Sequence, residues 1–178
     1  MAGTKNVIDI IYARLRELGQ TVAVAESITG GELVAELSKP AGASSILRGG
    51  VVAYQNDVKV EVLGVSAALI ATHGVVSAEV AREMAAKVRE RFAADWGLAT
   101  TGVAGPDSLE GVAPGVAYIA VVGAKVNGPT KAEVAKSEVA RSEVARSEVA
   151  KVVATGARPE VRETCVKEAI GLLAKALE

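Results

Sequence analysis

The sequence contains few aromatic residues, one cysteine and one histidine. Aromatic side chains make up 3% of its 178 residues, so the core that its 50% hydrophobic content supports must be aliphatic. The single cysteine, Cys165, excludes an internal disulfide and favours a reducing compartment. Because His73 is the only histidine, a zinc site built from cysteine and histidine ligands is excluded as well.

Neither sign of charge dominates, and no long hydrophobic run is present. Twenty Lys and Arg oppose 21 Asp and Glu, and the net charge of −1 creates no field that would attract nucleic acid or an anionic membrane. No stretch approaches the ~18 apolar residues of a membrane span, and the charged N-terminal segment does not resemble a signal peptide. We therefore expect a cytoplasmic protein of one domain, residues 1–178, without nucleic-acid or membrane partners. Assembly into a homo-oligomer is left open.

The spacing of apolar residues predicts an α/β protein. Val7, Ile8 and Ile11 recur at helical spacing, and short β-branched runs indicate buried strands. Ser77 is expected to cap a long helix. The expected strands are residues 21–25, 50–54, 96–101, 115–122 and 151–154; the expected helices are residues 7–18, 32–37, 78–92 and 159–177, with short helical pieces at 58–63 and 66–72.

Residues 131–150 form a tandem repeat with the sequence KAEVA, KSEVA, RSEVA, RSEVA. A period of five matches neither the 3.6 residues of a helix nor the two residues of a strand, so its valines cannot line one face of either element. We expect a charged and mostly exposed insertion, either a helix or an extended hairpin, with no catalytic role.

Ser27 is the first candidate for chemistry, because it lies in a turn between a predicted strand and a predicted helix. Small residues follow it, and the start of the helix would offer unpaired N–H groups to an anion or an oxyanion. The alternative is that Ser27 only caps the helix, a role that serine fills well.

Lys59 is the second candidate. A nucleophilic serine needs a base, and a lysine whose pKa is lowered by burial can act as one in a chain with a single histidine. The alternative is an ordinary exposed lysine on a helix, and spacing alone does not separate the two.

The other polar positions indicate binding or structural roles. Arg158, at the start of the last predicted helix, can clamp a phosphate or a carboxylate. His73 and Cys165 are interpreted as a helix C-terminal residue and a core residue. The turn TGVAGPD, residues 101–107, matches neither nucleotide-binding fingerprint but can present backbone N–H groups to a ligand.

The motif AESITGG, residues 25–31, resembles the signature of the CinA C-terminal domain family, which includes nicotinamide mononucleotide deamidases. Further matching segments follow in order across nearly the whole chain outside the repeat. They are GASS (42–45), GVVAYQN (50–56) followed by Lys59, LGV (63–65), HGVVS (73–77), TGVAGPD (101–107) and PG (114–115).

The resemblance implies a three-layer α/β/α sandwich around a mixed, mostly parallel sheet of about five strands. It also implies an amidohydrolase of pyridine nucleotide salvage that converts nicotinamide mononucleotide, a small-molecule substrate, to nicotinate mononucleotide and ammonia. Because no room is left for the pyrophosphatase domain of longer relatives, the resemblance is to the stand-alone form. No metal and no cofactor are implied.

Carried over by motif, the resemblance makes Ser27 the nucleophile and Lys59 its base, with Tyr54 assisting or orienting them. Arg158 matches the arginine of the family's G-D-R element, which is Gly156-Ala157-Arg158 here. The implied substrate-binding residues are Thr29, Gly30, Gly31, Asn56, Thr101, Gly102, Ala104, Gly105 and Arg158.

A function of a different class competes with the enzyme. The family takes its name from competence, and the repeat could serve as a docking surface in a non-enzymatic interaction module that binds a nucleotide or a protein partner. The enzyme is preferred because the candidate nucleophile, base and surrounding glycines are all present. Release of ammonia from nicotinamide mononucleotide distinguishes the two.

Overall fold

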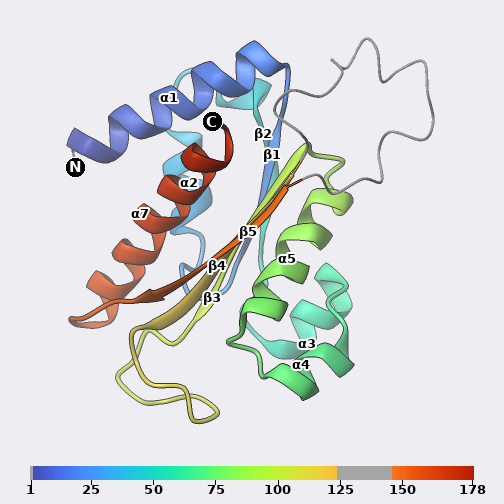
Figure 1. Cartoon of the computed structure of the whole chain (residues 1–178), viewed down its shortest axis with the longest axis vertical. Coiled ribbons are helices and arrows are strands. Elements are labelled where there is room, and N and C mark those ends of the chain that lie inside the picture. Colours follow the sequence, from blue (N-terminus) through green and yellow to red (C-terminus); the bar gives the residue numbers. More distant parts are fainter. Residues whose placement is uncertain (1, 124–145) are drawn as a thin grey trace.

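The computed structural model describes residues 2–123 and 146–178, with side chains from residue 7 onward. One sheet of five strands forms its centre, and helices cover both faces (Figure 1). The α/β/α sandwich with a mixed sheet that the sequence predicts is confirmed. The strands, in the spatial order β2-β1-β3-β4-β5, are β2 (Leu47–Val52), β1 (Val22–Glu26), β3 (Trp96–Gly102), β4 (Val116–Gly123) and β5 (Arg146–Val153).

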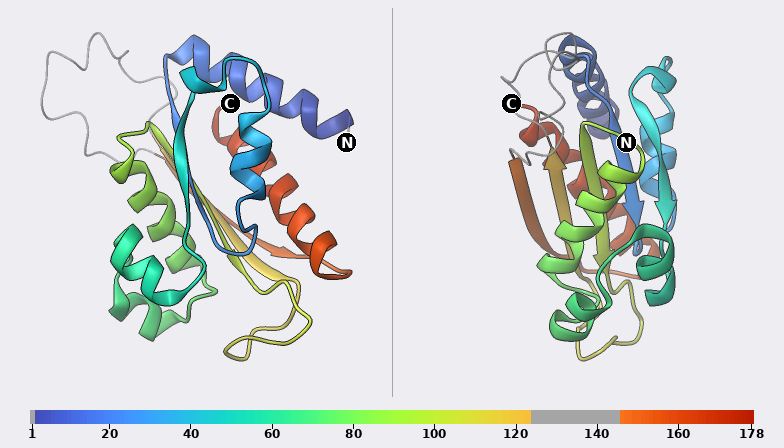
Figure 2. Two further views of the ribbon diagram at one scale, coloured as in Figure 1. Left: turned by 180° about the vertical axis from the view of Figure 1, so that it is seen from behind. Right: turned by 90° about the vertical axis from the view of Figure 1, so that its right-hand side faces the viewer.

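The strands β2, β1 and β3 run parallel to one another, and β4 is antiparallel to both of its neighbours. On one face lie α1 (Ala2–Leu18), α2 (Glu32–Ser38) and α7 (Arg158–Ala176), and the other face carries α5 (Ala78–Arg91) (Figure 2). Short helical elements complete the described chain: η1 (Ala43–Ser45), α3 (Asn56–Val58), the π-helical turn η2 (Lys59–Leu63) and α4 (Ala67–His73).

Alternation along the strands explains the two layers of core. In β1, Val22 and Val24 face α1 and α7, whereas Ala23 and Ala25 face α5. The face toward α5 is lined by small side chains, so this helix lies very close to the sheet. A Cβ atom on Gly97 would come within 1.9 Å of the Ala85 carbonyl oxygen, and only glycine fits there.

Several local predictions are confirmed. The Ser77 hydroxyl caps α5 by accepting a hydrogen bond from the Val80 N–H. His73 is the last residue of α4 and is followed by Gly74 at φ 75°. Cys165 is fully buried in the core against α1, and burial raises the pKa of its thiol to about 11. Such a thiol is a core group and not a nucleophile.

The predicted second strand was placed incorrectly. It was expected at residues 50–54, but β2 spans Leu47–Val52, so Tyr54 lies beyond the strand. Two adjacent glycines hide the start of this strand from sequence patterns, because glycine carries no side chain to mark a face. The pairing of β2 with β1 places Gly49 and Gly50 inside the ladder.

The prediction for the last unit of the repeat is also wrong. Residues 146–150 were expected in an exposed insertion, and the final strand was expected only at 151–154, but β5 begins at Arg146. β5 pairs with β4 over its whole length, and Val149 and Val152 pack on opposite sides of the sheet. Because β5 is covered on both faces, it accommodates valines three residues apart, which point to opposite sides of the sheet. The remaining units, residues 131–145, lie outside the described residues.

Within residues 2–123 and 146–178, no helix is both long enough and apolar enough to cross a membrane.

Candidate functional site

Three parallel strands bring the predicted site residues to one edge of the sheet. Glu26, the last residue of β1, pairs with Val52 on β2 and with Thr100 on β3. The pairing continues past the strand ends, because the Ala53 N–H donates to the Glu26 carbonyl at 2.8 Å and the Ser27 N–H donates to the Thr100 carbonyl at 2.9 Å. Ser27 is therefore fixed between the segments that lead to Tyr54 and to Thr101. This edge is where ligands bind in open α/β sheets.

Ser27 itself is 9% exposed and lies between β1 and α2. Among the described residues, none forms a hydrogen bond with its hydroxyl. Gly31 occupies the N-cap position of α2, and no serine caps this helix. The alternative reading of Ser27 as a helix cap is therefore wrong.

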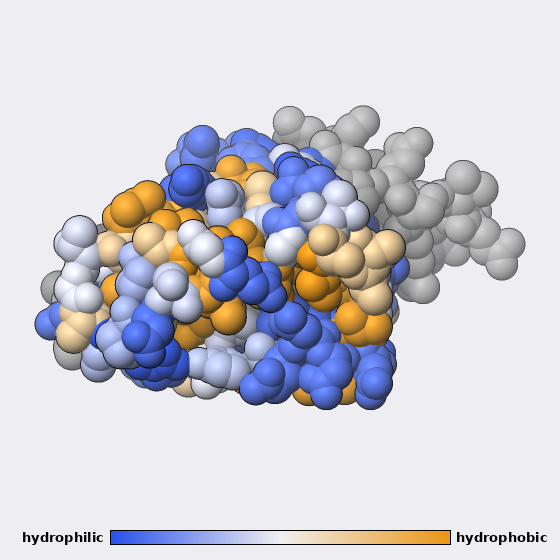
Figure 3. Space-filling model, turned by 90° about the horizontal axis from the view of Figure 1, so that it is seen from below, coloured by the Kyte–Doolittle hydropathy of each residue, from blue (hydrophilic) through white to orange (hydrophobic). Residues whose placement is uncertain are grey.

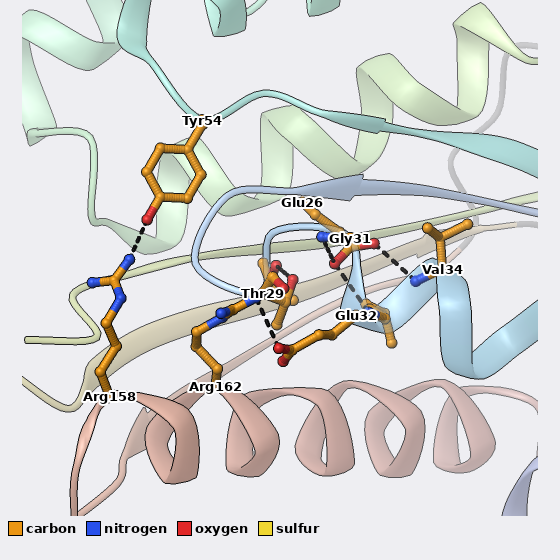
Figure 4. Close-up of polar contacts among 10 residues, drawn as sticks. Glu26, Thr29, Gly31, Glu32, Val34, Tyr54, Arg158 and Arg162 are labelled. Carbon is orange, nitrogen blue, oxygen red and sulfur yellow. Dashed lines mark hydrogen bonds and ion pairs between the residues drawn. The ribbon is translucent and has the colours of Figure 1, made fainter.

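Glu26 caps α2 in its place. Its buried carboxylate accepts hydrogen bonds from the N–H groups of Gly31, Leu33 and Val34 at 2.8–3.0 Å (Figure 4). The unpaired N–H groups expected at the start of this helix are consequently already occupied. Sequence reasoning missed Glu26, although a carboxylate at the end of a fully apolar strand and just before a helix is a signal for such a cap.

Two backbone donors of the turn remain without a protein partner in the described chain. The Gly30 N–H donates to the Ser27 carbonyl and the Glu32 N–H to the Thr29 carbonyl, whereas neither the Ile28 nor the Thr29 N–H forms such a bond. These two amides follow the candidate nucleophile directly. Backbone N–H groups next to a nucleophile often stabilise the oxyanion. Their place directly after Ser27 therefore makes these two amides candidate oxyanion donors.

Lys59 is almost completely buried, with 1% of its surface exposed. Its ammonium donates to the Tyr54 carbonyl at 2.9 Å. Burial lowers the pKa of Lys59 from 10.5 to about 8, while the carboxylate of Glu110 opposes part of this shift. The alternative of an ordinary exposed lysine is wrong, because Lys59 is buried.

Tyr54 and Arg158 meet across the edge of the sheet. Arg158 of α7 donates a hydrogen bond to the Tyr54 hydroxyl (Figure 4). It donates another to the Gly105 carbonyl at 2.9 Å. Tyr54 is 49% exposed, and Arg158 is also exposed. Among the described residues its hydrogen-bond acceptors are neutral, and an exposed guanidinium of this kind is a suitable partner for an anion such as phosphate.

The second turn has mainly structural contacts. The Thr101 hydroxyl donates to the Val75 carbonyl at 2.9 Å and so ties β3 to the segment before α5. A Cβ atom on Gly102 would lie 2.6 Å from the Ala117 Cβ and 2.8 Å from the Ile28 Cδ1, so glycine lets the Ser27 turn approach β3 and β4. Ala104 is buried in the core.

A cavity of about 540 Å³ opens between the segment after β2 and the loop after β3. Its lining residues are Tyr54, Gln55, Asn56, Asp57, Leu109 and Glu110. Asn56, a predicted binding residue, therefore lines a space next to Tyr54. Seen from this end, the molecule carries hydrophobic surface between hydrophilic margins (Figure 3).

Arg162 is a second arginine that sequence reasoning missed. It lies on α7, four residues after Arg158, and donates to the Thr29 carbonyl at 2.9 Å while pairing with Glu32 at 2.8 Å (Figure 4). Because residues four apart share a helix face, the spacing from Arg158 could have drawn attention to it.

Comparison with known protein families gives one match over most of the chain. A family model described as the CinA C-terminal domain matches residues 4–154. A CinA-like protein of Gloeobacter violaceus is 52% identical over 112 residues, which are 62% of this chain and 26% of that protein. A CinA-like protein of Anaeromyxobacter dehalogenans is 46% identical over 122 residues, 68% of this chain and 30% of that protein. The chain thus matches less than a third of the length of these curated relatives.

Solved structures share the fold over nearly the whole chain. A competence or damage-inducible protein of Enterobacter asburiae superimposes with a TM-score of 0.84 at 26% identity and covers 98% of both chains. A competence/damage inducible protein of Agrobacterium tumefaciens gives a TM-score of 0.81 at 26% identity, covering 98% of this chain and 96% of that one.

Proposed function

The chain belongs to the CinA C-terminal domain family, and from this premise we propose that it is an amidohydrolase. The proposed reaction converts nicotinamide mononucleotide to nicotinate mononucleotide and ammonia, a step of pyridine nucleotide salvage in NAD metabolism. The proposal requires neither a metal nor a cofactor, and it assigns the catalytic roles to Ser27, Lys59 and Tyr54.

The observation that carries the proposal is the burial of Lys59, whose ammonium donates to the Tyr54 carbonyl just beyond β2. A lysine with a pKa of about 8 is partly neutral near neutral pH, so it can accept a proton, which an ordinary lysine does poorly. Tyr54 links this lysine to Ser27, because its carbonyl holds the Lys59 ammonium and its neighbour Ala53 pairs with the residue that precedes Ser27.

In the proposed mechanism neutral Lys59 takes the Ser27 hydroxyl proton as the oxygen attacks the carboxamide carbon. The carbonyl oxygen gains negative charge, which the Ile28 and Thr29 N–H groups would stabilise. When the C–N bond breaks, Lys59 returns the proton to the nitrogen, which leaves as ammonia. Water then attacks the acyl-enzyme ester, and Lys59 again relays the proton, so that the nicotinate carboxylate and the Ser27 hydroxyl are restored.

Arg158 is proposed to bind the phosphate of the mononucleotide. Its two present acceptors, the Tyr54 hydroxyl and the Gly105 carbonyl, are neutral, so a phosphate dianion would compete favourably for the guanidinium. Binding at this position would leave the Tyr54 hydroxyl free to hydrogen bond near the reacting group. The cavity lined by Asn56 offers room for the remainder of the substrate.

The test is ammonia release from nicotinamide mononucleotide by the purified chain and by Ser27→Ala. We expect the variant to lose activity by at least about 10³-fold while its circular dichroism spectrum stays unchanged. Ser45→Ala, which removes an exposed hydroxyl that donates to the Gly42 carbonyl at the start of η1, serves as the matched control and should keep full activity.

Near-wild-type turnover in Ser27→Ala would contradict the assignment of the nucleophile. A wild-type chain that binds the mononucleotide but releases no ammonia would instead favour the interaction module.

A further inference from the structure

Two arginines of α7 reach the same edge of the sheet, but their contacts differ in kind. Arg158 is exposed and touches the Tyr54 hydroxyl and the Gly105 carbonyl, both on the substrate side of the proposed site. Arg162 is partly buried, with 26% of its side chain exposed, and its Nη2 contacts the Thr29 carbonyl and a carboxylate oxygen of Glu32. The guanidinium of Arg162 is therefore engaged with the Ser27 turn itself (Figure 4).

This turn has little intrinsic rigidity. Gly30 has φ 58° and Gly31 has φ 102°, and glycine populates many backbone conformations in an unrestrained chain. Glu26 fixes the turn from its donor side by binding the Gly31 N–H. On the acceptor side, the Thr29 carbonyl receives the Glu32 N–H at 3.1 Å and the Arg162 guanidinium at 2.9 Å.

The Thr29 carbonyl is coupled to the two unpartnered N–H groups of the turn. The Thr29 carbonyl and the Thr29 N–H lie in two planar peptide units joined at the Thr29 Cα, so a shift of the Thr29–Gly30 peptide that moves this Cα also displaces the Thr29 N–H. Arg162 is restrained by Glu32, and α7 is anchored in the core through Val161 and Cys165. Because α7 is itself held in the core, its arginine restrains the turn that follows the candidate nucleophile.

We propose that Arg162 is a positioning residue that holds the Thr29–Gly30 peptide so that the Ile28 and Thr29 N–H groups meet the oxyanion. The inference rests on the proposed function. Arg162 contacts neither the substrate nor the reacting atoms in this role and acts only through the turn. Because oxyanion donors act on the transition state more than on the bound substrate, its loss lowers kcat and leaves KM nearly unchanged.

The two arginines provide a matched pair of variants for steady-state kinetics with nicotinamide mononucleotide. For Arg162→Ala we expect kcat to fall about 10- to 100-fold while KM changes less than about twofold. Arg158→Ala should show the opposite pattern, with a raised KM. Lys167→Ala, which breaks an exposed ion pair with Glu163 on the same helix, is the control and should match the wild type. A change confined to KM in Arg162→Ala would overturn the proposal.

Two further variants separate the carbonyl contact from the ion pair. Glu32→Gln removes the charge that pairs with Arg162 but leaves the guanidinium able to reach the Thr29 carbonyl, so we expect less than about a threefold loss in kcat. Arg162→Lys retains a donor for one carbonyl and should recover part of the activity that alanine loses. Equal losses in Arg162→Lys and Arg162→Ala, or a full loss in Glu32→Gln, would contradict positioning through the Thr29 carbonyl.

Amide hydrogen exchange tests the positioning independently of the reaction. Arg162→Ala should speed exchange in the peptide covering residues 27–31 by at least about tenfold, whereas Lys167→Ala should not. If the wild type releases no ammonia, the proposed function fails while the exchange result still decides whether Arg162 holds the turn. If the wild type is active and neither kcat nor exchange changes in Arg162→Ala, the present inference alone is wrong.

Discussion

Burial and charge act in opposite directions on Lys59. Loss of hydration lowers the pKa of its ammonium, and the Glu110 carboxylate raises it, with burial the larger effect. The resulting pKa of about 8 leaves the lysine able to gain and lose a proton near neutral pH. An arginine at the same position would remain protonated, so the two cations are not equivalent here.

The first prediction is a rate that rises with pH. If neutral Lys59 is the base, kcat/KM should increase up to about tenfold per pH unit below the pKa of about 8 and level off above it. Lys59→Arg should be inactive at every pH, and Lys59→Ala should lose nearly as much activity as Ser27→Ala. Initial rates across the pH range measure both effects, and an active Lys59→Arg enzyme excludes lysine as the base.

The second prediction concerns stability. Because the pKa of folded Lys59 is about 8 and its ordinary value is 10.5, the unfolded chain binds more protons between these values. The contribution of Lys59 to the free energy of unfolding should therefore increase as the pH rises through this window. Relative to Lys59→Met, the wild type should gain about 2 kcal/mol between about pH 7.5 and pH 10 in urea titrations. A constant difference between the two proteins would show that folding does not lower the pKa of Lys59.

The third prediction separates binding from chemistry at Arg158. An arginine that holds a remote phosphate contributes equally to the bound substrate and to the transition state, so Arg158→Ala should raise KM about tenfold or more with little change in kcat. Nicotinamide riboside, which lacks the phosphate, should be a poor substrate for the unmodified chain. Equal specificity constants for the two substrates would remove the phosphate role of Arg158.

At the scale of elements, the start of α7 is incompletely capped. The N-cap residue, Ala157, has φ −73° and ψ 164°, which suits a capping side chain, but alanine has no acceptor to offer. Glu160 partly compensates, because its carboxylate accepts the Ala157 N–H. This helix supplies both Arg158 and Arg162, so its first turn affects the geometry of the candidate site.

The fourth prediction follows from that missing cap. Ala157→Ser should stabilise the protein by about 1 kcal/mol, since a serine at this position can accept a hydrogen bond from the first turn. In thermal denaturation the melting temperature should rise by about 2–4 °C. The same substitution inside the helix, Ala174→Ser, provides the control and should not raise the melting temperature. An unchanged melting temperature in Ala157→Ser would show that Glu160 already meets the need for a cap.

At the scale of the whole molecule, the repeat leads directly into the sheet. Residues 141–145 and 146–150 have the same sequence, RSEVA, so removing either unit produces the same polypeptide. The first five residues of β5 therefore do not by themselves decide which RSEVA unit pairs with β4. Val152, which is 8% exposed and has no counterpart in the preceding unit, specifies the observed register through its burial.

The fifth prediction is that deletion of residues 141–145 leaves activity and melting temperature nearly unchanged. The remaining RSEVA unit can supply the start of β5, and a shorter connection alters loop-closure entropy only slightly. Size-exclusion chromatography with light scattering and a melting curve provide the measurements. A lower oligomer mass or a large fall in melting temperature would mean that the repeat is structural.

The amino-acid sequence alone determined the α/β class from its residue pattern, and the resemblance of its motifs to a known family supplied the layered architecture and the candidate nucleophile and base. Hydrophobic periodicity is a local property, and it located the strands around residues 22–26 and 96–102 and the helices beside them to within a few residues. Ser27 was marked by its place after a buried strand, whereas the roles of Ser27 and Lys59 came from the resemblance of the surrounding motifs to a known family.

Only the tertiary structure decided how these residues are supported. Arg158 bonds to Tyr54 across 104 residues of sequence, and Arg162 bonds to Thr29 across 133. The spacing of residues along the chain carries no information on contacts at such separations, so neither hydrogen bond could be predicted from it. The role of Glu26 could not be inferred for a related reason. A carboxylate at a strand end faces either water or the N–H groups of the next helix, depending on how sharply the chain turns between them. Gly30 and Gly31 permit a sharp turn but do not specify it.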